Sequence, residues 1–172
     1  MLALCSVSCA AVESASMIAP VPQVDTQASV TTDGNPENWS ERTSEVLVNA
    51  LNLTGVKYKY GGNSPEIGFD CSGFVRYVFS QATSLTLPHS TLAISQLGKT
   101  IPKNEIQPGD LVFFKTIKNA ISHVGIYMGN NRFIHSPSAG GQVRVESMTE
   151  GYWARHFSGA QRLDITKSSL KE

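Results

Sequence analysis

The sequence predicts an α+β fold in which N-terminal helices pack on an antiparallel sheet. Apolar residues repeat at helical spacing between residues 40 and 98. From residue 107 onward, short runs rich in β-branched and aromatic residues alternate with turn residues, as strands do. Helices that come first and strands that follow, with short connections, are typical of an α+β domain.

Length and composition limit the class of protein. The chain has 172 residues, of which 41% are hydrophobic and 16% charged, which is ordinary for one globular domain. Lys plus Arg equals Asp plus Glu, at 14 each. A net charge of zero gives no basic face of the kind that nucleic acid requires, so we expect no nucleic-acid partner. Composition sets no oligomeric state.

The first 38 residues predict a targeting segment and a tether. Residues 1–12 are apolar and resemble the core of a secretory signal, although the usual preceding Lys or Arg is absent. Cys9 follows small residues, as at a bacterial lipoprotein processing site, and would carry a lipid that tethers the chain to a membrane. Residues 13–38 are polar and proline-containing, as in a disordered tether. We expect export to the cell envelope, in the periplasm or anchored at the outer membrane.

The folded domain is expected over residues 39–165, followed by a tail over 166–172. Its first helix should begin near Trp39, with Ser40 as the N-cap. Gly55 stands where that helix should stop. This helix has a one-sided apolar stripe formed by Val46, Leu47, Ala50 and Leu51.

Two more helices are expected after a glycine-rich loop at residues 58–65. The second helix covers residues 71–81 and should pack into the core through one apolar face. The third helix is shorter, covers residues 91–97 and is closed by Gly98. The core face of the second helix is Phe74, Val75, Val78, Phe79 and Ala82.

The second half of the chain predicts a sheet. A turn at residues 107–110 precedes the first of its strands. Hairpin-length connections between the later runs favour antiparallel pairing. The expected strands cover residues 111–114, 122–128, 132–136, 143–147 and 157–162.

Cys71 is the candidate nucleophile. The other two cysteines lie in the first ten residues, so Cys71 is the only cysteine of the predicted domain. It stands at the start of an amphipathic helix, where free N–H groups and the helix dipole favour a thiolate and lower a thiol pKa. The competing interpretation, a buried cysteine acting as a small hydrophobe, explains the polar neighbours poorly. No zinc-type ligand spacing occurs, so we expect neither a metal nor a cofactor.

His123 is the candidate base, and His135 the candidate partner that orients it. A thiol nucleophile needs such a base, and the base needs an orienting group. A three-residue loop at residues 129–131 would place Gly125 opposite His135 and both imidazoles on one face of the hairpin. That loop requires positive φ at Asn131. A two-residue turn would place the imidazoles on opposite faces.

Several motifs in a fixed order resemble the NlpC/P60 cysteine peptidases of bacterial cell walls. The resemblance runs from about residue 43 to residue 163. The motifs are Tyr58-Lys59-Tyr60-Gly61-Gly62, Asp70-Cys71-Ser72-Gly73-Phe74, Gln107-Pro108-Gly109-Asp110-Leu111-Val112-Phe113-Phe114, His123-Val124-Gly125-Ile126-Tyr127 and Phe133-Ile134-His135.

This resemblance implies a papain-like core and a set of roles. Cys71 matches the family's nucleophile, His123 its general base and His135 the polar residue that orients the base. Tyr58 matches a tyrosine near the oxyanion position. The positions that line the site and contact the peptide stem of the substrate are matched by Asp70 and Ser72.

The resemblance also implies a substrate. Family members cleave the stem peptides of peptidoglycan, commonly between D-glutamate and a diamino acid, or at a cross-link between stems. His89 stands where the family often has Arg, which leaves the fine specificity open. Two alternatives remain. A Cys-His acyltransferase or lipid hydrolase on a related fold would need an apolar groove beside Cys71. A non-catalytic wall-binding domain would have no use for a Cys-His pair.

Overall fold

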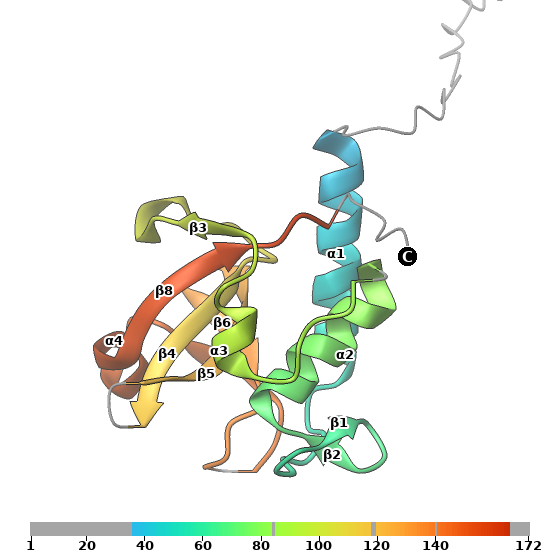
Figure 1. The fold of residues 1–172 in the computed structure, drawn as a ribbon, viewed down its shortest axis with the longest axis vertical. Coiled ribbons are helices and arrows are strands. Elements are labelled where there is room, and N and C mark those ends of the chain that lie inside the picture. The colour runs from blue at the N-terminus through green and yellow to red at the C-terminus, as the bar shows by residue number, and fades with distance from the viewer. Residues whose placement is uncertain (1–35, 84, 118–119, 140, 166–172) are drawn as a thin grey trace, which may run out of the picture. The chain divides into compact units, whose positions relative to one another are not determined.

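The computed structural model describes residues 36–83, 85–117, 120–139 and 141–165. The predicted signal-like segment and the C-terminal tail lie outside these residues. Within them, helices come first and an antiparallel sheet follows, so the α+β prediction is confirmed (Figure 1). None of the helices in these ranges is long and apolar enough to cross a membrane.

Helix α1 spans Pro36–Asn52 and begins earlier than predicted. Ser40 therefore lies inside the helix, where its carbonyl accepts the Ser44 hydroxyl at 2.9 Å, and its prediction as the N-cap is wrong. The reason is that proline is well suited to the first helical position, so Pro36 can start the helix. Gly55 follows the end of the helix with φ 88°, as predicted for a stop.

The glycine-rich loop forms a small hairpin that the sequence did not predict. Strands β1 (Asn63–Ser64) and β2 (Gly68–Phe69) pair in it. Gly62 packs so closely that a Cβ there would lie 2.3 Å from the Gly68 carbonyl oxygen. The Asp70 N–H donates to the Gly62 carbonyl at 3.1 Å, which holds the loop against the residue that precedes the next helix.

Helix α2 spans Cys71–Thr83 and is the central helix of the core. It packs against α1 on one side and strands β5 and β6 on the other (Figure 1). Its predicted core residues Phe74, Val75 and Val78 are fully buried. Helix α3 spans only Thr91–Ile94, shorter than predicted, and the Ser90 hydroxyl caps it by accepting the Ala93 N–H at 3.1 Å.

The main sheet has the strand order β3-β8-β4-β5-β6-β7, with every neighbouring pair antiparallel. The sequence did not predict β3, the 3₁₀ turn η1 or helix α4. The bounds are β3 Lys99–Ile101, η1 Lys103–Glu105, β4 Leu111–Ile117, β5 Ala120–Gly129, β6 Arg132–His135, β7 Arg144–Ser147, α4 Gly151–His156 and β8 Phe157–Arg162.

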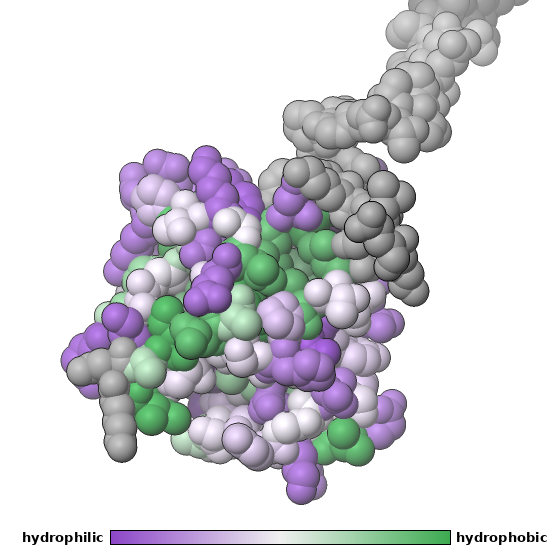
Figure 2. Space-filling model, in the orientation of Figure 1, coloured by the Kyte–Doolittle hydropathy of each residue, from purple (hydrophilic) through white to green (hydrophobic). Residues whose placement is uncertain are grey.

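The sheet buries both of its faces. Along β4, Leu111 and Phe113 join the core under α2, whereas Val112 and Phe114 join a second cluster that includes Trp153. This follows from the alternation of side chains along a strand. Figure 2 shows apolar side chains gathered near the middle of one face of the molecule, with hydrophilic ones toward its edges.

The carboxylate of Asp110 ties β4 to β8. It is fully buried and accepts Arg162 Nε at 2.7 Å and Nη2 at 2.8 Å, together with the Gln107 N–H at 2.8 Å. Asp110→Ala would remove both carboxylate acceptors of the guanidinium, together with the acceptor of the Gln107 N–H. We expect the free energy of unfolding to fall by about 3–5 kcal/mol, measured by urea denaturation. In the double variant with Arg162→Ala the two losses should be less than additive. A loss below about 1 kcal/mol would contradict this assignment.

The β5–β6 hairpin corrects one prediction and confirms another. Gly129 pairs with Arg132, so the turn has two residues, Asn130 and Asn131, with φ 50° and 56°. The predicted three-residue loop is therefore wrong. The two histidines nevertheless share a face, because an extra residue between Tyr127 and Gly129 forms a β-bulge that shifts the register by one. Two adjacent asparagines suit a turn that needs positive φ at both positions.

Candidate active site

The N-terminal turn of α2 is fixed by Asp70, the residue just before Cys71. Its Oδ1 accepts the Gly73 N–H at 2.7 Å, which is an N-cap bond, and the Ser72 hydroxyl at 2.9 Å. Its Oδ2 accepts the Gly61 N–H at 2.9 Å. One carboxylate therefore caps the helix and binds the glycine-rich loop to it, and the position of Cys71 follows from both contacts.

The Cys71 thiol is half-buried against the start of β5. Its Sγ lies 3.6 Å from Thr91 Oγ1 and 3.8 Å from the Ser122 carbonyl oxygen. Burial raises the pKa of the Cys71 thiol, and the Asp70 carboxylate adds to the rise, while the Thr91 hydroxyl opposes it. The predicted lowering of the pKa is therefore wrong, because desolvation outweighs the helix terminus. The thiol of the free protein is protonated at neutral pH.

His123 and His135 form a buried pair. His123 Nε2 lies 2.7 Å from His135 Nδ1, and the side chains are on one face of the hairpin, as predicted. Gly125 lies two residues after His123 on β5, and a Cβ there would lie 2.7 Å from Phe133 Cδ2, 2.9 Å from the Ile134 carbonyl oxygen and 3.1 Å from His135 Cβ. Burial lowers the pKa of both imidazoles. Both rings are therefore neutral at pH 7.

Neutral buried histidines make the fold sensitive to acid. In the unfolded chain they take up protons below about pH 6.5, whereas in the folded chain they resist protonation. The unfolded state then binds more protons, so stability is complete above about pH 6.5 and is lost as the pH falls toward the lowered folded-state pKa values. We expect a loss of up to about 1.4 kcal/mol per pH unit for each histidine, measured by urea denaturation between pH 7.5 and 5.

The control for this acid effect is His135→Asn, which keeps an acceptor for His123 and removes one titrating group. Its loss of stability between pH 7.5 and 5 should be about half that of the wild type. Equal unfolding free energies for the wild type at pH 7.5 and pH 5 would show that the pair is not held neutral.

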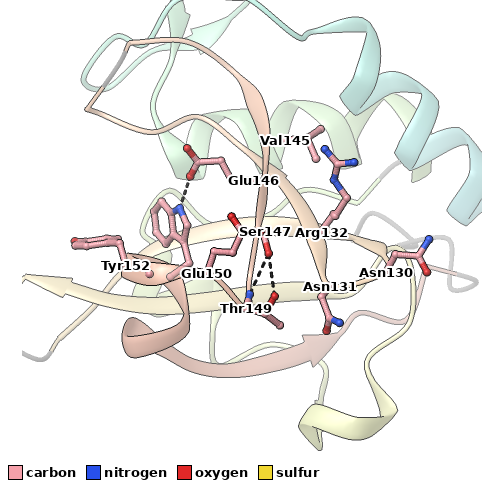
Figure 3. Close-up of a pocket in the computed structure, with 11 residues that line it drawn as sticks. Asn130, Asn131, Arg132, Val145, Glu146, Ser147, Thr149, Glu150 and Tyr152 are labelled. Atoms are coloured by element: carbon pink, nitrogen blue, oxygen red, sulfur yellow. Dashed lines mark hydrogen bonds between the residues drawn. The ribbon is translucent and has the colours of Figure 1, made fainter.

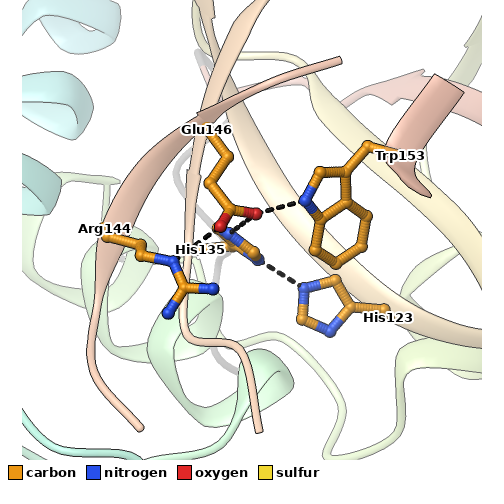
Figure 4. A network of polar contacts seen from close by, with 5 residues as sticks. All are labelled: His123, His135, Arg144, Glu146 and Trp153. Carbon is orange, nitrogen blue, oxygen red and sulfur yellow. Dashed lines mark hydrogen bonds and ion pairs between the residues drawn. The ribbon is translucent and has the colours of Figure 1, made fainter. Parts of the chain in front are cut away.

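Glu146 on β7 extends the pair and was not found from the sequence. Its Oε2 lies 3.1 Å from His135 Nε2, with an angle that falls short of a hydrogen bond, and it accepts Trp153 Nε1–H (Figure 4). Its Oε1 accepts Arg144 Nε–H at 2.6 Å. Trp153 also stacks on His123, with ring centroids 5.1 Å apart.

These contacts favour one tautomer for each ring. A proton on His135 Nε2 faces the Glu146 carboxylate, which leaves His135 Nδ1 as the acceptor of His123 Nε2–H. His123 Nδ1 then carries a lone pair. The Cys71 thiol contacts the strand backbone beside His123, but no hydrogen bond joins it to the ring in the described part of the chain. Such contacts are often open in substrate-free enzymes and tighten on binding.

Tyr58 lies close to the thiol. Its backbone N–H donates to the Gly141 carbonyl at 2.6 Å, and it forms a bridge with Phe69. Burial raises the pKa of the Tyr58 phenol, and the Cys71 thiol contributes the next largest part of the rise. The hydroxyl therefore remains a hydrogen-bond donor beside Cys71 at neutral pH.

His89 is exposed, and its imidazole contacts an arginine side chain. Its Nδ1 lies 2.9 Å from Nη1 of Arg76, on α2, whose Nε–H donates to the Leu87 carbonyl at 2.8 Å. Arg76 could not be identified from the sequence, because it is 13 residues from His89 along the chain and the two side chains meet only in the folded protein. A guanidinium thus stands beside the position at which the family often has arginine.

Two cavities flank the histidine pair and its neighbours. One, of about 410 Å³, is lined by His123, Arg144 and Trp153 among others. The second, of about 720 Å³, lies over the β5–β6 turn and the β7–α4 connection (Figure 3). Both share Glu146 and Trp153, but only the smaller cavity is lined by His123. The smaller cavity is therefore the one adjacent to the candidate base.

A helix that begins at a cysteine and packs on an antiparallel sheet is the arrangement of a papain-like α+β core. The model of the NlpC/P60 family matches residues 55–162, and the chain belongs to this family. It is 37% identical over 132 residues to murein DD-endopeptidase MepH of Escherichia coli K12, covering 74% of this chain and 49% of that protein. It is 42% identical over 120 residues to γ-DL-glutamyl hydrolase of Bacillus subtilis, covering 69% and 29%.

Solved structures agree with the fold. An NlpC/P60 protein from Bacillus cereus has a TM-score of 0.66 and 30% identity, over 70% of this chain and 39% of that one. The NlpC/P60 domain of the peptidoglycan hydrolase SagA has a TM-score of 0.62 and 30% identity, over 70% and 98%. The chain thus spans nearly all of an isolated domain but half or less of several longer relatives.

Proposed function

We propose that this chain is a cysteine endopeptidase that hydrolyses peptide-stem bonds of bacterial peptidoglycan during growth or turnover of the cell wall. The observation that carries the proposal is the Cys71 thiol at the start of α2, packed on the strand that bears the buried His123–His135 pair. Two relatives, a murein DD-endopeptidase and a γ-DL-glutamyl hydrolase, support peptidoglycan stem peptides as the substrate class.

In the proposed reaction His123 is the general base. Its Nδ1 takes the Cys71 proton as Sγ attacks the carbonyl carbon, so charge separates only with substrate present, in keeping with a neutral thiol and a neutral imidazole. His123 then gives that proton to the leaving amine, and a thioester remains on Cys71. Water, deprotonated by His123, hydrolyses the thioester and releases the acyl half as a carboxylic acid, and His123 returns its proton to the Cys71 sulfur. His135 holds the tautomer and orientation of His123 throughout.

The oxyanion of the intermediate needs donors near Cys71. The backbone N–H of Cys71 at the helix start and the Tyr58 hydroxyl are the proposed ones. Asp70 and Ser72 remain proposed contacts to the peptide stem. Their hydrogen bonds within the protein support a second role, which is to hold the turn that carries Cys71.

Two charged side chains beside His123 favour a polar peptide over an acyl chain. Arg144 and Glu146 place charged groups beside His123, where a lipid hydrolase would need apolar walls.

We further propose that the protein is exported to the cell envelope, in the periplasm or held at the outer membrane by a lipid on Cys9. Two relatives are murein endopeptidases, and murein is a component of the cell envelope, which supports this location.

The test of this function is the digestion of purified peptidoglycan. Soluble fragments should appear, and mass spectrometry after labelling of new amino termini should assign the cut to the bond between D-glutamate and the diamino acid, or to a cross-link. Release of amino sugars with reducing ends, with no new amino terminus, would contradict a peptidase.

A further inference from the structure

The cavity beside His123 has no role in the reaction as described so far. Its volume of about 410 Å³ is within the range of small-ligand sites. It lies between the start of β5, strand β7 and helix α4. Its walls are apolar at Ile117 and aromatic at Trp153, with a charged pair, Arg144 and Glu146, at one side.

The position of this cavity identifies the half of the substrate that it faces. His123 must give a proton to the leaving amine, so the leaving group has to lie against His123. His123 lines the cavity, whereas Cys71, which retains the acyl half, does not. The cavity is therefore on the leaving-group side of the scissile bond.

The guanidinium of Arg144 lines this cavity in an orientation suited to binding an anion. Glu146 Oε1 accepts its Nε–H at 2.6 Å, which fixes the plane of the guanidinium. Figure 4 shows the two Nη atoms turned away from Glu146, with one of them directed toward the side of His123. The side chain is about one-third exposed, with a relative accessibility of 33%. Among the described residues no hydrogen-bond partner is seen for its Nη groups, and a guanidinium fixed in this way matches the geometry of a carboxylate.

The charges around Arg144 allow its guanidinium to bind a substrate carboxylate in addition to the carboxylate of Glu146. Glu146 is occupied by Trp153 Nε1 and Arg144 Nε, and it lies 3.1 Å from His135 Nε2. The imidazoles of His123 and His135 are neutral, because burial lowers their pKa values. Among the described residues that line the cavity, Arg144 is the only one with a permanent positive charge.

We propose that this cavity binds the diamino acid released by the reaction, and that the Nη groups of Arg144 bind the carboxylate at its distal end. The inference rests on the proposed function. At the bond between D-glutamate and the diamino acid, and at a direct cross-link to its distal amine, the leaving amine belongs to the diamino acid. Diaminopimelate has a carboxylate beside its distal amine and lysine has none, so Arg144 makes the enzyme selective for stems that contain the acidic diamino acid.

The test compares matched substrates. Stem peptides with diaminopimelate, with diaminopimelate amidated at the distal carboxyl, and with lysine are hydrolysed by the full chain. The amide changes the charge but hardly the shape. We expect the wild type to prefer the carboxylate over the amide by about 10-fold or more in kcat/KM, mainly through KM. Arg144→Gln should bring this ratio close to one, and Arg144→Lys should keep part of it.

The matched control is Arg76→Gln, which removes another arginine near the site but outside this cavity. Its carboxylate-to-amide ratio should equal that of the wild type. Loss of the ratio in Arg76→Gln and not in Arg144→Gln would place the carboxylate at Arg76 and His89 and overturn the proposal. Equal rates of the wild type on all three stems would overturn it while leaving the peptidase function intact. Cleavage of none of the stems would instead refute the proposed function.

Discussion

Replacing Cys71 with alanine should abolish hydrolysis of peptidoglycan. The substitution removes the sulfur on which the thioester is proposed to form, and loss of a catalytic nucleophile costs roughly 10⁴-fold or more in kcat. The fold should persist, because alanine is close in size to cysteine and the side-chain contacts of Sγ with Thr91 and the Ser122 carbonyl are long, at 3.6 Å and 3.8 Å. The measurement is the rate at which soluble fragments leave purified peptidoglycan, with circular dichroism to compare the folds.

Two variants give this result its controls. Cys71→Ser keeps the shape and the hydrogen-bonding capacity of the side chain and should still be inactive, because a hydroxyl is a much weaker acid than a thiol. Thr91→Val removes the hydroxyl 3.6 Å from Sγ without touching the nucleophile, and should retain most activity. Substantial fragment release by a folded Cys71→Ala protein would exclude Cys71 as the nucleophile.

Replacing His123 with alanine should lower kcat by roughly 10²–10⁴-fold, the usual contribution of a positioned general base. The residual rate should rise with pH, because without the base only thiol that has already ionised can attack, and burial raises the pKa of Cys71. In the wild type the lowered pKa of His123 keeps the base neutral in mild acid, so activity should persist well below pH 6.5. The measurement is kcat against pH for both proteins.

The matched control for His123→Ala is His156→Ala, which removes an imidazole from the end of α4. His156 Nδ1 contacts the Tyr152 carbonyl oxygen at 2.7 Å and lies outside the candidate site. This variant should keep the wild-type pH profile. A His123→Ala protein with an unchanged profile would show that another group accepts the thiol proton.

Much of the candidate site could be predicted from the sequence because its signals are local. The period of apolar residues along α2 placed Cys71 at a helix start, and the observed helix begins at that residue. Alternation along β5 put His123 and Gly125 on one face. The shared face with His135 was predicted through a three-residue loop, and the structure reaches it by a two-residue turn plus a bulge. A three-residue loop and a two-residue turn with a bulge each add one residue to the hairpin, and this extra residue brings both histidines to the same face.

The remaining parts depend on tertiary structure that local patterns do not carry. The connection from β6 to β7 is too long for a turn rule to set the register, so the arrival of Glu146 near His135 could not be predicted. Helix α4 has only six residues and brings Trp153 onto His123 through packing. The direction of the Cys71 pKa likewise depends on burial of the thiol, which only the folded chain supplies.

The identity of the nucleophile is tested most directly by partial alkylation of Cys71. In a full-length Cys5→Ser/Cys9→Ser background, iodoacetamide can modify only Cys71. Samples stopped at increasing times are divided, and one part is assayed on peptidoglycan while mass spectrometry of the Cys71 peptide gives the alkylated fraction. The fraction of activity lost should equal the fraction alkylated, and excess stem peptide should slow both. Activity that survives complete alkylation would contradict a Cys71 nucleophile.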